Sequence, residues 1–121
     1  MIAAILESGE PERLYTGLSL LVSAAADGRQ ARGLATFGAL ELLLDDALEE
    51  RGRAARGDVF GRTLAELRAT AAELDDVRIW ACAAAVETGA IDRDRIEERL
   101  DGVLSTPRFL REVGDAQLVV V

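Results

Sequence analysis

The residue best suited to carry out chemistry is the one thiol of the chain, at Cys82. A cysteine thiolate is a nucleophile that exchanges sulfur with other thiols and persulfides. Most other reactive groups are missing, because the 121-residue sequence has no histidine and all 14 of its basic residues are arginines. These absences exclude a Ser–His–Asp triad, a histidine-ligated metal, a lysine Schiff base and a P-loop. A single cysteine also excludes an internal disulfide and a multi-cysteine zinc site, so we expect no metal and no cofactor.

The local sequence around Cys82 is one in which a thiolate is favoured. The apolar run at residues 77–82 predicts a buried strand, and the small residues after it predict a helix at 83–88. A helix N-terminus has unpaired N–H groups and a partial positive charge, both of which stabilise a thiolate. Ala83 and Ala84 would leave room for a reactant beside the sulfur. A free cysteine also packs in cores as a small hydrophobic residue, so a purely structural Cys82 is the alternative.

Other residues are expected at the same edge of the fold. In open α/β sheets ligands bind beyond the carboxyl ends of the strands. Two further predicted strands end in short polar or glycine-containing segments, and the first predicted helix contributes a tyrosine that could hydrogen-bond into a site. The pocket candidates besides Cys82, Ala83 and Ala84 are Glu7, Ser8, Gly9, Tyr15, Phe37 and Gly38. A solvated rim position for the glutamate, and core or interface packing for the tyrosine, are the competing interpretations.

The elements that must position these residues alternate regularly along the chain. Short apolar runs at residues 2–7, 31–37, 77–82 and 116–121 predict strands, and amphipathic helices separate them. Parallel strands are joined by helical crossovers and covered on both faces, so they lose the polar alternation of exposed strands. We therefore predict an α/β fold: a three-layer α/β/α sandwich around a mostly parallel sheet of four or five strands. The whole chain, residues 1–121, forms a single domain.

Several boundaries are predicted from local signals. A leucine stripe that begins at Leu40 predicts a helix that ends near Gly52. Residues 51–61 hold three glycines and three arginines without an apolar period, which predicts an exposed loop. Asp92 is expected to cap one later helix, and Thr106, followed by Pro107, is expected to cap the last one.

The charge balance narrows the class of partner. There are 22 acidic and 14 basic residues, a formal net charge of −8, which argues against a nucleic-acid partner because phosphate binding needs a cationic face. No apolar stretch approaches the roughly 20 residues of a membrane span, and the first residues do not resemble an export signal. We therefore expect a cytoplasmic protein without membrane contact. The acidic run at residues 45–50 is interpreted as a solvated helix face in preference to paired catalytic carboxylates or a metal site.

The segment around the cysteine resembles a known family. Residues 78–90, Arg-Ile-Trp-Ala-Cys-Ala-Ala-Ala-Val-Glu-Thr-Gly-Ala, are similar to the cysteine segment of the DsrE/DsrF/DsrH-like family, which includes sulfur-relay subunits related to TusD. The resemblance implies a DsrE-like α/β/α fold assembled as trimers or hexamers. It also implies that Cys82 matches the cysteine that carries persulfide sulfur between donor and acceptor proteins. Unlike the relay subunits, this chain has no basic residue close to the cysteine.

Two functions from different classes follow from these observations. The first is a small cytoplasmic sulfur carrier, a sulfurtransferase-type subunit that accepts and passes sulfane sulfur as a persulfide on Cys82. The alternative is a non-catalytic homo-oligomeric scaffold or small-ligand-binding module in which Cys82 is structural. Residues 119–121, three valines, would form an edge strand that needs covering in either case.

Overall fold

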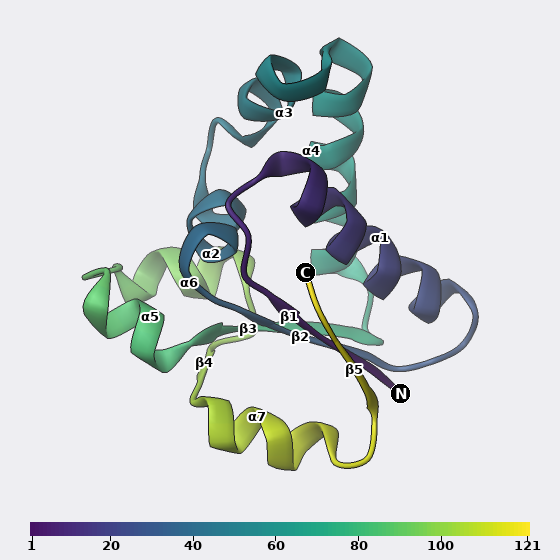
Figure 1. Cartoon of the computed structure of the whole chain (residues 1–121), viewed down its shortest axis with the longest axis vertical. Helices are drawn as coiled ribbons and strands as arrows, with labels where there is room; N and C mark the ends of the chain where they lie inside the picture. Colours follow the sequence, from purple (N-terminus) through teal and green to yellow (C-terminus); the bar gives the residue numbers. More distant parts are fainter.

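A computed structural model describes all 121 residues as five strands and seven helices (Figure 1). The strands form one parallel sheet in the order β4-β3-β2-β1-β5. In chain order the elements are β1 (Ile2–Leu6), α1 (Pro11–Ala26), β2 (Ala31–Ala35), α2 (Phe37–Leu44), α3 (Leu48–Arg56), α4 (Asp58–Glu73), β3 (Val77–Cys82), α5 (Ala83–Thr88), α6 (Arg93–Arg99), β4 (Val103–Leu104), α7 (Thr106–Val113) and β5 (Gln117–Val120).

The order of the strands explains how the helices are distributed over the two faces of the sheet. The steps from β1 to β2, β3 and β4 all run in one direction, and the chain then returns past β1 to add β5. Right-handed crossovers place the helices of the first three steps on one face and α7 on the other. Figure 1 shows α1, α2 and α4 on one side of the sheet and α7 on the opposite side. The predicted three-layer α/β/α architecture is confirmed, with five strands.

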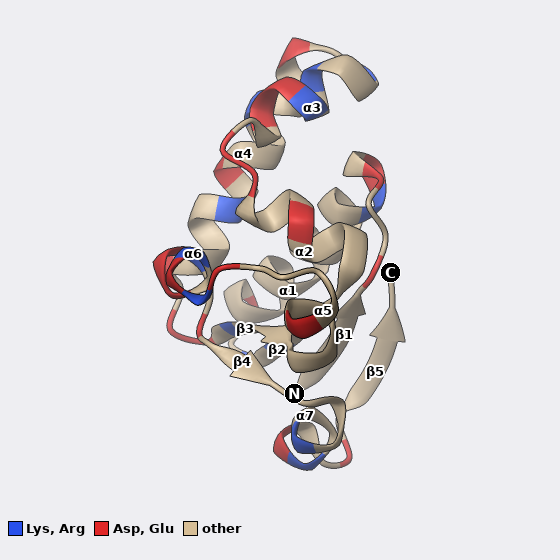
Figure 2. Ribbon diagram, turned by 90° about the vertical axis from the view of Figure 1, so that its left-hand side faces the viewer, with Lys and Arg blue, Asp and Glu red and all other residues tan.

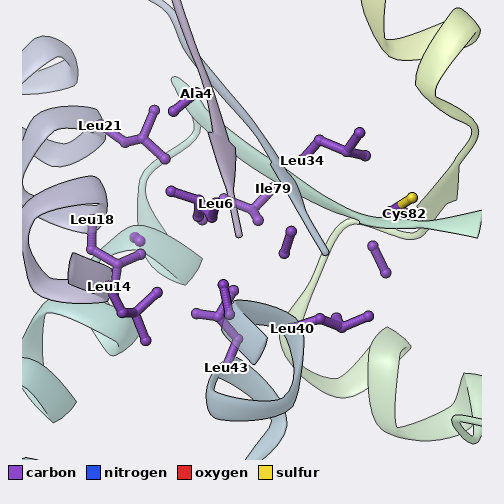
Figure 3. Packing of buried hydrophobic residues seen from close by; sticks show 14 of the residues in the cluster. Ala4, Leu6, Leu14, Leu18, Leu21, Leu34, Leu40, Leu43, Ile79 and Cys82 are labelled. Carbon is purple, nitrogen blue, oxygen red and sulfur yellow. The ribbon is translucent and has the colours of Figure 1, made fainter. Parts of the chain in front are cut away.

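The main core lies between the sheet and the helices that include α1 and α2. Leu14, Leu18 and Leu21 of α1 are at most 2% exposed and pack toward the sheet, and leucines of α2 complete the layer (Figure 3). Gly17 allows α1 to approach β1 closely, because a Cβ there would lie 2.5 Å from Cδ2 of Leu6. Buried leucines and the missing side chain of Gly17 therefore let α1 pack directly against the strands.

The opposite face of the sheet is covered by α7 through one aromatic anchor. Phe109 is fully buried and packs edge-to-face on Trp80 of β3, with ring centroids 6.2 Å apart. The edge strand β5 is less well covered. Its side chains Leu118 and Val120 are 42% and 59% exposed. Both faces of the central strands β1 and β2 are thus buried, whereas the edge strand β5 is largely exposed.

The structure confirms most of the predicted strands and corrects one loop. The strand Val77–Cys82 is found with the predicted bounds, and the short strand β4 was not anticipated. The prediction of an exposed loop at residues 51–61 is wrong, because this stretch is helical except at Gly57, where φ is +95°. Gly52 and Gly61 serve close packing between α3 and α4: a Cβ on Gly52 would lie 2.8 Å from Cα of Gly61.

The leucine stripe that was expected to form one helix is divided into two. Helix α2 ends at Leu44, and α3 begins at Leu48. The guanidinium of Arg68 donates to the main-chain oxygens of Leu43 and Asp45, at 3.3 and 2.7 Å, and so satisfies carbonyl groups at the end of α2. Figure 2 shows many charged residues in α3, α6 and α7, whereas the strands contain few. None of the helices has both the length and the apolarity needed to cross a membrane.

Candidate functional site

Cys82 lies at the carboxyl end of β3, where three neighbouring strands end. Its backbone is extended and it directly precedes α5, so the thiol sits at the junction of strand and helix as predicted from the sequence. Ala35 of β2 is in register with Ala81, which places Thr36 beside Cys82 on one side. On the other side Cys82 is in register with Leu104 of β4, two residues before Thr106 at the start of α7.

The pKa of Cys82 depends on burial and on four neutral polar groups of these segments. Burial raises the pKa of Cys82, but hydrogen bonds from the N–H of Ala85, the hydroxyl of Thr36, the N–H of Ala84 and the hydroxyl of Thr106 lower it by more. The net effect holds the pKa of Cys82 below its ordinary value. The stabilisation comes from oriented dipoles and not from a charged neighbour, in agreement with the absence of a nearby basic residue in the sequence.

The thiol is enclosed. Cys82 is 6% exposed and belongs to the buried cluster of the protein, and Thr36 beside it is 8% exposed. Figure 3 shows the sulfur at the far end of β3, apart from the leucines of α1 and α2. The site therefore combines a favoured thiolate with restricted access, and a reactant reaches the sulfur only when the surrounding segments separate.

The two threonines that lower the pKa of Cys82 were not predicted from the sequence. Thr36 was seen only as part of the segment after the second strand. Thr106 was expected to cap the last helix, but the cap is Ser105, whose Oγ accepts a hydrogen bond from the N–H of Arg108 at 3.3 Å. The hydroxyl of Thr106 is instead one of the groups that lower the pKa of Cys82. The expected cap at Asp92 is confirmed, since its carboxylate accepts from the N–H of Asp94.

The other predicted pocket residues are distributed over four places. Ala83 and Ala84 lie beside Cys82 at the start of α5. Glu7, Ser8 and Phe37 line a crevice of about 500 Å³ at the ends of β1 and β5, and Cys82 is not among its lining residues. The predicted residues therefore do not form one pocket with the thiol.

A second cleft, of about 800 Å³, lies between the β1–α1 connection and helices α2 and α3. It is lined in part by Gly9 and Gly38, whose backbones are in contact: a Cβ on Gly38 would lie 2.6 Å from Cα of Gly9. Tyr15 is in neither cavity, because its ring stacks on Phe60 of α4 with centroids 5.2 Å apart.

The acidic run after α2 makes ion pairs. Arg51 forms a hydrogen-bonded ion pair with Asp45, and this bond, with a further one from the N–H of Ala47, holds the pKa of Asp45 below its ordinary value. Asp46 pairs with Arg99 at 2.7 Å. No three metal-ligating side chains come together anywhere in the structure. The run is a set of solvated ion pairs at the surface.

Fold and site together define an α/β protein with a thiol at the carboxyl edge of a five-stranded parallel sheet. Comparison with models of known protein families finds none that matches the chain, and a search of curated proteins likewise finds no match.

Proposed function

We propose that the protein is a sulfur carrier that accepts sulfane sulfur on Cys82 and passes it on as a persulfide. The observation that carries the proposal is the position of the one thiol of the chain, between the end of β3 and the start of α5, with a pKa that neutral polar groups hold below its ordinary value. The resemblance of residues 78–90 to the cysteine segment of DsrE-like proteins supports the same function, as does a three-layer α/β/α fold. The reducing cytoplasm is the compartment in which such a thiol would work.

The chemical step requires only a nucleophilic sulfur. The thiolate of Cys82 attacks the outer sulfur of a donor persulfide, R–S–SH. A new S–S bond forms on Cys82, the S–S bond of the donor breaks, and the donor leaves as the thiolate R–S⁻. Transfer onward is the reverse reaction with an acceptor thiolate. No net oxidant is consumed, and the hydroxyls of Thr36 and Thr106 keep Cys82 in the attacking form and stabilise it again as leaving group.

The enclosure of the sulfur sets a condition on this reaction. Because Cys82 is 6% exposed, the donor must meet a form in which the start of α5 and the start of α7 have moved apart. Helix α5 has six residues, of which Ala85 and Val86 are buried, so the open form exposes these side chains for a short time. Partner proteins would supply and remove the sulfur in that open form.

The test is to treat the native protein with a small sulfane donor and measure its intact mass. We expect the wild-type chain to gain one sulfur atom and Cys82→Ser to gain none. Release of that sulfur to an added thiol, with return to the original mass, completes the expected cycle. A native wild-type chain that gains no sulfur, while the urea-unfolded chain does, would refute the carrier function.

Burial of the thiol favours a second candidate, a non-catalytic homo-oligomeric module in which Cys82 is structural. The exposed apolar side chains of Leu118 and Val120 on the edge strand β5 give such a module a surface to bury between subunits. The family resemblance suggests trimers or hexamers. Iodoacetamide separates the two candidates: rapid alkylation of native protein at neutral pH supports the carrier, and an inert thiol supports the module. Light scattering that shows only monomers at micromolar concentration would remove the oligomer.

A further inference from the structure

The crevice at the ends of β1 and β5 lies where α/β proteins commonly bind ligands. The strand order reverses between these two strands, because β2, β3 and β4 lie on one side of β1 and β5 lies on the other. Helical crossovers diverge at such a point and leave an opening beyond the carboxyl ends of the strands. The crevice has a volume of about 500 Å³ and is lined by Glu7, Ser8, Arg13, Phe37, Val120 and Val121. Its volume falls within the range of about 300–1,000 Å³ that is typical of small-ligand sites.

One part of the crevice is apolar and held in place. Phe37 and Val120 are 58% and 59% exposed, so two large apolar side chains of one small cavity face solvent. The ring of Phe37 is presented from a left-handed backbone, with φ of +44°. Flanking bonds hold this conformation: Thr36 N–H donates to Leu6 O at 2.9 Å, and Ala39 N–H donates to Glu7 O at 3.1 Å.

The other part of the crevice carries two opposite charges that are not paired with each other. Glu7 and Arg13 are both exposed, and neither takes part in an ion pair within 4.0 Å. Ser8 adds a hydroxyl whose oxygen accepts from the N–H of Glu10 at 3.1 Å, which leaves its own O–H free to donate. The crevice thus offers a carboxylate that can bind a cation, a guanidinium that can bind an anion, and a hydroxyl donor, all beside an apolar wall.

We propose that this crevice binds a free α-amino acid with an apolar side chain. Arg13 and the hydroxyl of Ser8 bind the carboxylate, and Glu7 binds the ammonium group. The side chain of the amino acid lies against Phe37 and Val120. A zwitterion satisfies both charges at once, whereas a monocarboxylate leaves Glu7 unpaired beside it and an amine leaves Arg13 unpaired. The site is independent of the proposed persulfide chemistry, because Cys82 does not line the crevice.

The binding test compares leucine with two analogues that each lack one charge. Isothermal titration of the wild-type protein with leucine, isocaproate and isoamylamine measures the contribution of the ammonium and carboxylate groups. We expect saturable binding of leucine, and binding of either analogue that is weaker by about tenfold or more, since each loses a charge-assisted contact. Cys82→Ser is expected to bind leucine as the wild type does.

Two variants and a control locate the site. Arg13→Gln and Glu7→Gln are exposed changes that leave the core intact, and each is expected to weaken leucine binding by about tenfold or more. Glu41→Gln, an equivalent change in the neighbouring 800 Å³ cleft, is expected to leave binding unchanged. Absence of saturable leucine binding, equal binding of isocaproate, or an equal loss in Glu41→Gln would each overturn the proposal.

Discussion

Replacing Thr36 by valine tests whether hydrogen bonding, and not shape, controls the ionisation of Cys82. Thr36 follows β2 in register beside Cys82, is 8% exposed, and carries a hydroxyl that lowers the pKa of Cys82. Valine has nearly the same shape but puts a methyl group where the hydroxyl was. The change therefore removes one of four donors to the thiolate and leaves the packing around it almost the same.

The expected magnitude follows from the value of one hydrogen bond to a charged group. Such a bond contributes about 1.5–3 kcal/mol, and each 1.36 kcal/mol changes an ionisation equilibrium by about tenfold. Thr36→Val should therefore lower the ratio of thiolate to thiol at a given pH by about tenfold or more. The pKa of Cys82 moves upward, because the donor stabilises the charged form far more than the neutral thiol.

The ultraviolet absorbance of the thiolate measures the ratio of thiolate to thiol at Cys82 directly in the folded protein. Subtracting the titration of Cys82→Ser removes the contribution of every other group, since no second thiol is present. Thr36→Ser keeps a hydroxyl and is the matched control, with a titration expected close to that of the wild type. If Thr36→Val also titrates like the wild type, or if both variants move upward equally, hydrogen bonding from Thr36 does not stabilise the thiolate and the reasoning fails.

Four further predictions concern stability, each measured by urea unfolding. Ala90→Gly should stabilise the protein by about 0.5–1 kcal/mol, because Ala90 follows α5 at φ +50°, where a Cβ is unfavourable; unchanged or lower stability would contradict this. Gly61→Ala should destabilise by about 1–3 kcal/mol, since its Cβ would meet the carbonyl oxygen of Glu49; full stability would mean that α3 and α4 are not in close contact. Phe109→Ala should lower the free energy of unfolding by about 3–5 kcal/mol, because it leaves a cavity between α7 and the sheet. A loss below about 1 kcal/mol would refute the anchoring role of Phe109. The stability advantage of wild type over Cys82→Ser should be complete above pH 9.0 and decline as the pH falls through the lowered pKa of the thiol; a pH-independent difference would contradict the lowered pKa.

The elements of the fold were largely predictable from the sequence, because their signals are local. The strand Val77–Cys82 could be bounded from its apolar run and the small residues after it, and this alone places Cys82 between a strand and a helix. The prediction of a loop at residues 51–61 was wrong for a physical reason. Gly52 and Gly61 resemble loop residues until the other helix is seen, since their lack of a side chain serves a contact between α3 and α4.

What the sequence by itself determined is the alternation of parallel strands and helices and the position of one thiol at a strand end. Only the tertiary structure decided that Thr36 and Thr106 lie where they lower the pKa of that thiol, because this depends on β2 and β4 lying on either side of β3. The burial of Cys82 and the crevice formed when β5 returns beside β1 depend on the same strand order. Periodicity is a property of neighbouring residues, whereas strand order arises from the packing of segments far apart in the chain, which no one segment encodes.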